Sequence, residues 1–157
     1  MIRKTIIYIL IGFLLQISNT YAQDHKNAIG IRAGLPVGIT YKHFFDTHSS
    51  LEAIIGTRWK GLSSSVKYEY HIETNLYPGL QWYVGSGAAL GYYNNNSPWV
   101  IGTDHRLIFG AEAIIGINYN FENAPMNLSF DWTPLFNFIG YVDFDFLQFA
   151  LSVRYLF

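Results

Sequence analysis

The residues that come nearest to a catalytic pattern in this sequence are a histidine, a serine and a glutamate at alternate positions. They are His48, Ser50 and Glu52. A histidine beside a serine can accept the hydroxyl proton and so create a nucleophile, and a carboxylate can orient the histidine. All three, however, fall in or beside a short polar stretch between two apolar segments, which also contains Thr47 and Ser49. Turn residues are therefore the preferred interpretation, and no catalytic residue is predicted.

The other groups that could do chemistry have no suitable partners in the sequence. Asp104 precedes His105 as a possible acid–histidine pair, but the further acidic residues that such a site needs are missing. The remaining histidines, which are too scattered for the converging ligands of a metal site, are His25, His43 and His71. Gly85-x-Gly87 lies in an expected strand, without the helix that follows a phosphate loop, so close packing explains it better. With no cysteine in the chain either, we expect no cofactor and no metal site.

Composition separates this chain from an average soluble domain. Of its 157 residues, 13% are charged and 18% aromatic, and glycine occurs 14 times. Ordinary soluble proteins have about 25% charged residues. A surface short of charge but rich in aromatic residues and glycine suits a protein that faces lipid. The length suits one domain, and with a formal charge of −1 and no basic patch, no nucleic-acid partner is expected.

The first 22 residues have the layout of a secretory signal peptide. Arg3 and Lys4 give a positive start, residues 6–15 form an apolar run, and Thr20 and Ala22 are the small residues before a cleavage site. The alternative, a transmembrane anchor, would need about 20 apolar residues. We therefore expect residues 1–22 to be removed and residues 23–157 to form one exported domain. Removal takes two of the 10 basic residues and none of the 11 acidic ones, so the net charge becomes −3.

Beyond that segment, apolar and polar residues alternate with a period of two, which is typical of strands and not of helices. In residues 126–138, for example, Phe130 and Phe136 alternate with Asn127 and Asp131. The segments that alternate in this way are residues 28–35, 37–45, 51–60, 62–72, 76–92, 106–121, 126–138 and 147–157. Because no further stretch could form a spanning helix, strands that enter a membrane must close into a barrel. The pattern predicts an all-β fold, an eight-stranded antiparallel up-and-down transmembrane β-barrel.

The two faces of these strands differ in a way that predicts which one points outward. One face carries the large aromatic residues, and the other carries glycine, alanine, serine and isolated charges. Small residues fit the interior of an eight-stranded barrel, which side chains fill, so the aromatic face is assigned to lipid. The lumen is then expected to hold a structural network of paired charges, because an unpaired buried charge is costly. Its members are Arg32, Lys42, Glu52, Arg58, Lys67, Glu69, Arg106, Glu112, Asp131 and Arg154, with Lys60 on the same face.

The connections predict an orientation for the barrel. With Phe157 at the periplasmic end, the periplasmic turns are residues 46–50, 73–75 and 122–125. The outer loops are then residues 35–37, 59–61, 92–104 and 138–144, of which only the third is long. Pro134 does not suit the interior of a closed barrel, which has no free edge for proline. We expect a bulge at Pro134, or a position at the outer rim.

Several stretches resemble the small outer-membrane β-barrel proteins common in Bacteroidota, which are eight-stranded barrels of the OmpA/OmpX type. The stretches are NLSFDWTP at residues 127–134, LSVRYLF at residues 151–157, GITYKHF at residues 38–44 and GAEAIIG at residues 110–116. The resemblance extends over the expected mature chain. It implies insertion in the outer membrane, where the barrel-assembly machinery reads an aromatic C-terminal strand.

These observations favour a non-enzymatic protein of the outer membrane, with a structural role or one mediated by its loops. A first alternative is a passage for small apolar molecules through a lateral opening near Pro134. A second is a lipid A-modifying enzyme, for which the pair formed by His48 and Ser50 would lie on the wrong side of the membrane. The expected partners are outer-membrane lipid and, during insertion, the barrel-assembly machinery, and the protein is expected to be a monomer.

Overall fold

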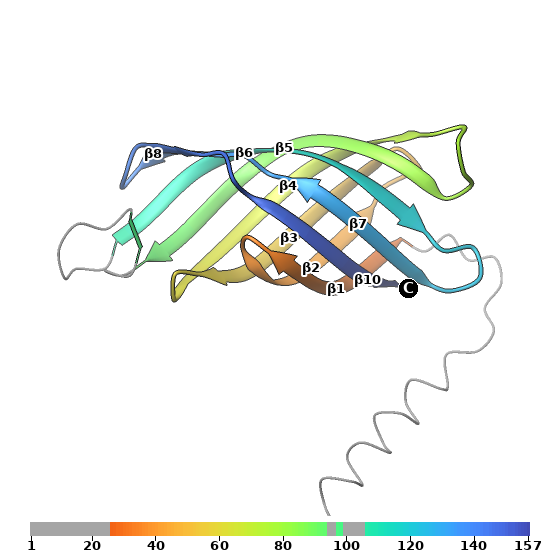
Figure 1. The fold of residues 1–157 in the computed structure, drawn as a ribbon, viewed down its shortest axis with the longest axis horizontal. Coiled ribbons are helices and arrows are strands. Elements are labelled where there is room, and N and C mark those ends of the chain that lie inside the picture. Colours follow the sequence, from red (N-terminus) through yellow and green to blue (C-terminus); the bar gives the residue numbers. More distant parts are fainter. Residues whose placement is uncertain (1–25, 94–96, 99–105) are drawn as a thin grey trace, which may run out of the picture.

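The computed structural model describes residues 26–93, 97–98 and 106–157, and these residues form ten antiparallel strands. The strands are β1 (Asn27–Gly34), β2 (Val37–Phe44), β3 (Ser49–Arg58), β4 (Gly61–Glu73), β5 (Leu80–Tyr93), β6 (Arg106–Asn120), β7 (Met126–Trp132), β8 (Leu135–Ile139), β9 (Asp143–Asp145) and β10 (Phe149–Leu156). Strands that follow one another in the chain pair with each other, except β7 with β8 and β9 with β10, and β1 also pairs with β10, so that the sheet closes on itself (Figure 1). The expected signal peptide, the pair formed by Asp104 and His105, and most of the long loop lie outside the described residues.

The wall of the barrel has eight strands, because two of them are each interrupted once. β7 and β8 both pair with β6 and follow one another along the same course. β9 and β10 likewise pair with β8 and β7 in turn. The predicted fold class is therefore confirmed: the protein is a closed eight-stranded antiparallel β-barrel.

The barrel has a polar interior and an apolar exterior, the reverse of a soluble domain. Among the described residues, 21 polar or charged residues are buried, against nine hydrophobic ones. The residues that alternate with these buried ones along each strand face outward. Ile31, for example, has 66% of its surface exposed, and Phe130 has 48%. Soluble proteins do not expose an apolar surface that continues around the molecule. The assignment of the aromatic face to the outside is thus what the structure shows.

The turns of the described chain gather at two ends of the barrel, the Phe157 end and the Gly140 end. At the Phe157 end lie the turns formed by residues 45–48, 74–79 and 121–125. At the Gly140 end lie the turns formed by residues 35–36, 59–60 and 140–142. The strand expected from residue 76 begins only at Leu80, because Pro78 and Gly79, at φ 80°, turn the chain before it.

Lys60 does not face the lumen as its place in the alternation predicted. Trp59 and Lys60 have φ angles of 49° and 61°, and together they form the two-residue hairpin turn that requires positive φ at both positions. In such a turn the two residues no longer alternate between the inner and outer faces of the barrel, as strand residues do. Lys60 is therefore exposed at the Gly140 end.

Pro134 interrupts the wall without opening it toward β6. Its carbonyl oxygen accepts a hydrogen bond from the Ala113 N–H at 3.1 Å, but proline has no N–H to return. The bulge expected at this place lies on the neighbouring strand. Between the pairs Trp132↔Phe149 and Leu135↔Asp145, the chain from β7 to β8 advances three residues while the chain from β9 to β10 advances four.

Candidate functional site

The described lumen is crossed by four buried ion pairs. Each pair joins strands that are not neighbours in the wall, so the side chains meet in the space between them. The pairs and their nitrogen–oxygen distances are Arg32–Asp131 at 2.5 Å, Lys42–Glu69 at 2.6 Å, Lys67–Glu112 at 2.8 Å and Arg154–Glu52. Four cations face four anions, so the formal charge of the set is zero. A balanced set satisfies the requirement that charges removed from water be paired.

Arg154 makes four hydrogen bonds within this network. Besides Glu52, its guanidinium donates to Thr40 Oγ1 at 3.2 Å, Asn127 Oδ1 at 3.0 Å and Ser129 Oγ at 2.7 Å. The planar guanidinium can donate in several directions at once, and here it links four strands.

Asp131, on the neighbouring strand β7, is the corresponding acceptor of the network. It receives two hydrogen bonds from Arg32, at 2.5 and 3.0 Å, and one from the Tyr83 hydroxyl at 2.9 Å. The Tyr83 ring fits there because Gly116 leaves room, since a Cβ on Gly116 would lie 2.6 Å from the ring. Glycines on the inner face thus provide the space that the network fills, and Gly87 does the same beside Lys67.

Two of the arginines expected in the network lie elsewhere. Arg58 is at the Gly140 end of β3, where it pairs with Asp145 of β9 and lies over the Trp59 ring. Arg106 is exposed at the start of β6 and donates to the Gly140 carbonyl oxygen at 2.8 Å. Both residues stand at strand ends, away from the four ion pairs: Arg106 is at the rim, and Arg58 lies at the Gly140 end of the lumen. The other eight predicted residues are the members of the four ion pairs.

A serine–histidine contact that the sequence did not reveal lies toward the Phe157 end. Ser50 is buried on the inner face of β3, not in a turn, and its Oγ lies 2.8 Å from Nε2 of His71. Glu69 approaches the same nitrogen at 3.6 Å. The opposite ring nitrogen, Nδ1, has no hydrogen-bond partner among the described residues, so none of their carboxylates orients the ring as in a catalytic triad. His48, in contrast, is exposed in the turn. The two residues of the His48-x-Ser50 pattern therefore lie in different environments, His48 exposed in the turn and Ser50 buried in the lumen.

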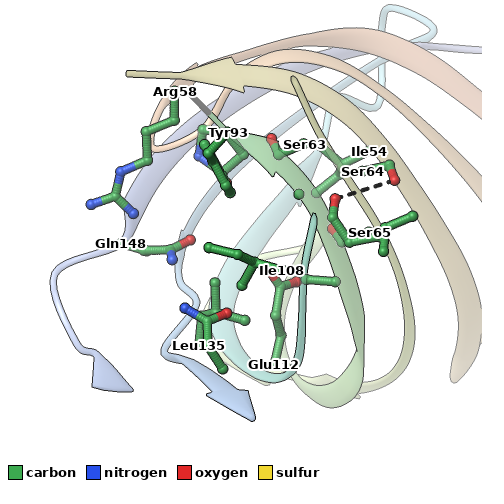
Figure 2. A pocket seen from close by; sticks show the side chains of 15 residues that line it. Ile54, Arg58, Ser63, Ser64, Ser65, Tyr93, Ile108, Glu112, Leu135 and Gln148 are labelled. Carbon is green, nitrogen blue, oxygen red and sulfur yellow. Dashed lines mark hydrogen bonds between the residues drawn. The ribbon is translucent and has the colours of Figure 1, made fainter. Parts of the chain in front are cut away.

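A hollow occupies the lumen toward the Gly140 end. It measures about 410 Å³, counting space open to solvent at its mouth, and only a small part of it is as wide as a water molecule. Figure 2 shows Arg58 and Gln148 on one side of it and Ile54, Ser64 and Ser65 on the other. The lining also includes the apolar residues Ile108 and Leu135 and the polar residues Glu112 and Asn137.

The wall beside this hollow is incompletely paired. β1 and β10 are hydrogen-bonded as far as the Leu35 N–H and the Phe149 carbonyl, at 3.0 Å. Beyond that point β9 pairs with β8 alone among the described strands. The side of β9 that faces away from β8 is called the β9 edge below. The β1–β2 hairpin stops short of the β3–β4 turn and of the β8 region in the ribbon view (Figure 1).

The part of the chain that the structure describes contains neither a metal site nor a membrane-spanning helix. No three histidine, aspartate or glutamate side chains come together there as metal ligands. Nor is any helix within residues 26–93, 97–98 and 106–157 long and apolar enough to span a membrane.

Comparison with known proteins shows a shared fold. No family model and no curated protein matches the sequence. Among solved structures, the N-terminal β-barrel domain of OprF from Pseudomonas aeruginosa matches with a TM-score of 0.66 and 17% sequence identity. The match covers 86% of this chain and 100% of that one. It supports the eight-stranded barrel fold that the resemblance implied, while the OmpA/OmpX type and the Bacteroidota family stay predictions.

Proposed function

We propose that this protein is an integral outer-membrane β-barrel with a closed lumen, and that its role in the envelope is structural or is exercised by its loops. The observation that supports this most strongly is the exposed apolar exterior around an interior of paired charges. An apolar exterior of this extent is stable in hydrocarbon, where a closed barrel satisfies every backbone group. The four ion pairs block the lumen between the hollow and the Phe157 end.

Two measurements test this proposal. The folded chain should migrate differently in gels before and after boiling, as a barrel that resists the detergent does. Purified protein in planar bilayers should show no steady open channel. A Glu52→Gln/Arg154→Leu variant, which removes the central pair, is expected to conduct more than the parent. A steady conductance of the unaltered protein would overturn the closed-lumen proposal.

Export and assembly form a further part of the proposal. Residues 1–22 would be cleaved, the Phe157 end would face the periplasm, and the barrel-assembly machinery would recognise the aromatic last strand. Phe157 is exposed and is held to Asn27 by two backbone hydrogen bonds, at 2.8 and 3.1 Å. N-terminal sequencing of the outer-membrane fraction should therefore begin at Gln23, and Phe157→Ala should lower the amount that is inserted. A single band at the monomer mass after cross-linking in membranes is expected.

We propose no catalytic role for the serine–histidine contact. Ser50 and His71 are 0% and 1% exposed, so that a lipid substrate has no access to them. Mass spectrometry of lipid A from cells with and without the protein checks this directly. A changed acyl pattern that Ser50→Ala abolishes, while the variant still inserts, would contradict the proposal.

A further inference from the structure

We propose that this barrel thins one leaflet of the membrane beside its β1–β2 hairpin, so that lipid head groups and not acyl chains cover the wall there at the Gly140 end. The inference rests on the proposed function, because it requires a barrel that spans a bilayer. It goes further, since a spanning barrel with an even apolar band would leave the bilayer equally thick on all sides.

The tall side of the wall includes β5, and its apolar band has the height of a bilayer. Trp82 and Tyr92 are exposed on the outer face of β5, with apolar or small outward residues between them. A strand rises about 3.4 Å per residue, which is about 2.5 Å along the axis of a barrel with the usual tilt. The ten residues from Trp82 to Tyr92 therefore rise by about 25 Å, the height of the apolar band between the aromatic girdles of outer-membrane barrels.

The low side of the wall is the β1–β2 hairpin, whose turn stops short of the other turns at the Gly140 end (Figure 1). Toward the Phe157 end, the exposed aromatic residue on this side is Tyr41, which pairs with Ile29 of β1. From Ile29 to Leu35 in the turn, six residues rise by only about 15 Å. The apolar wall on this side is thus about 10 Å lower than a bilayer requires.

A charged pair lies directly beyond the low turn. Arg58 follows Thr57, whose partner on the hairpin is Val37. Arg58 pairs with Asp145, so that this ion pair crosses from β3 to the β9 edge just past the hairpin. The two side chains are 9% and 11% exposed, more than those of the four pairs in the lumen. Charged groups at this level are costly beneath acyl chains, and local thinning of the bilayer brings polar groups to them.

Tilting of the barrel does not remove the mismatch, because a tilt moves both ends of the low side together. The Phe157 end of this side carries polar groups on its outer face. The Tyr41 hydroxyl donates to Asn27 Oδ1 at 2.8 Å, and His43 Nδ1 lies 2.8 Å from the same oxygen. Such groups belong at head-group level, and a shift of the low side toward the other leaflet would draw them into hydrocarbon. The adjustment therefore falls on the leaflet at the Gly140 end.

The test uses nitroxide labels, because the chain has no cysteine and a single one can be introduced for labelling. Leu35→Cys carries the label in the low turn. Ala88→Cys, on the outer face of β5, is the matched control, since Ala88 lies six residues above Trp82 as Leu35 lies six above Ile29. In dioleoylphosphatidylcholine vesicles, a water-soluble nickel complex should relax the label at position 35 several-fold more strongly than the label at position 88.

The possible outcomes separate the alternatives. Equally weak nickel relaxation at positions 35 and 88 would mean that acyl chains cover the low turn and would overturn the proposal. Spin–spin broadening of the label at position 35 would place a second copy of the chain there and would overturn the lipid assignment. Strong nickel relaxation at position 88 would show that the tall side is not in hydrocarbon, so that the proposed function itself fails.

The ion pair beyond the low turn has its own test in the same vesicles. Arg58→Leu/Asp145→Leu removes both charges and should reduce nickel relaxation of the label at position 35 at least twofold. Arg106→Leu, at the rim on the tall side, is the control and should leave it unchanged. A gel of each sample before and after boiling shows that the variant is folded. An unchanged value in the double variant would overturn the role of the ion pair in holding the head groups there.

Discussion

Toward the Phe157 end, charged side chains from six strands meet in three ion pairs across the lumen. Toward the Gly140 end, where Glu112 of the fourth pair lies, the lumen contains a hollow with apolar residues in its lining. The wall differs in the same way. The ladders near the ion pairs are regular, and the interruptions at residues 133–134 and 146–148 both lie beside the hollow. The region that side chains cross-link and the region of irregular backbone thus lie in different parts of one small barrel.

This separation teaches how one narrow barrel can contain a cross-linked region beside a less regular one. Ion pairs between distant strands hold the wall at a fixed curvature, and each is strong only because its partner is close and water is excluded. Backbone with fewer regular hydrogen bonds and fewer buried contacts belongs to the less stable parts of a protein. The two halves should therefore respond differently to equivalent substitutions.

The largest contrast is expected between Arg154 and Arg58. Arg154→Leu leaves Glu52 buried without its partner and should lower the free energy of unfolding by about 3–5 kcal/mol. Arg58→Leu breaks a pair at the rim and should cost about 1–2 kcal/mol, between the values for exposed and buried pairs. Reversible urea unfolding in lipid vesicles measures both. Equal losses would mean that the two halves do not differ in rigidity.

The second contrast concerns the outer face. Phe130 lies within β7 on the wall around the ion pairs, and Phe130→Arg should cost about 2–4 kcal/mol at mid-bilayer depth. Phe144 of β9 is also exposed but lies toward the Gly140 end, so Phe144→Arg should cost about 0–1 kcal/mol. The same unfolding measurement applies. A small loss for Phe130→Arg would show that this position does not lie in hydrocarbon.

Much of this barrel could be predicted because the period of two is a local property. Alternation assigned eight wall strands and placed residues such as Arg32 and Phe130 on opposite faces. The pairing partners could not be predicted, since the tilt and stagger of the strands decide which inward residues share a level. Arg154, for example, meets Glu52 across two intervening strands. Nothing in the spacing of these two residues reveals that contact.

The errors fall at the ends of strands, where local signals are weakest. Arg106 and Lys60 follow the inward register but stand at the rim and in a turn. Ser50 was assigned to a turn because the expected strand began at residue 51, two residues after β3 begins. Ser50 and Glu52 share one face in any strand that includes both, so an earlier boundary would have indicated the contact of Ser50 with the interior.

The third contrast tests packing within one strand. Gly87 and Ala89 lie on the inner face of β5, and a Cβ on Gly87 would approach Cγ of Lys67 to 2.9 Å. Gly87→Val should therefore cost about 1–3 kcal/mol through overpacking. Ala89→Val adds its methyl groups to the hollow, and its effect should stay within about 0.5 kcal/mol. The urea midpoints of the two variants measure these losses of stability. A larger loss for Ala89→Val than for Gly87→Val would contradict the assignment of a filled lumen beside Gly87 and a hollow beside Ala89.

The smallest effect is expected at the turn formed by residues 45–48. Asp46 accepts hydrogen bonds from the Ser49 hydroxyl at 2.5 Å and from the His48 N–H at 2.7 Å, and these hold the pKa of Asp46 below its usual range. The stabilisation is complete above the pKa of the unfolded chain and is lost as pH falls through the lower pKa of the folded protein. The difference in unfolding free energy between the parent and Asp46→Ala should shrink over that acidic interval. Glu122→Ala, at another turn of the same end, controls for the loss of one negative charge, and a difference that stays constant with pH would rule out the carboxylate as its source.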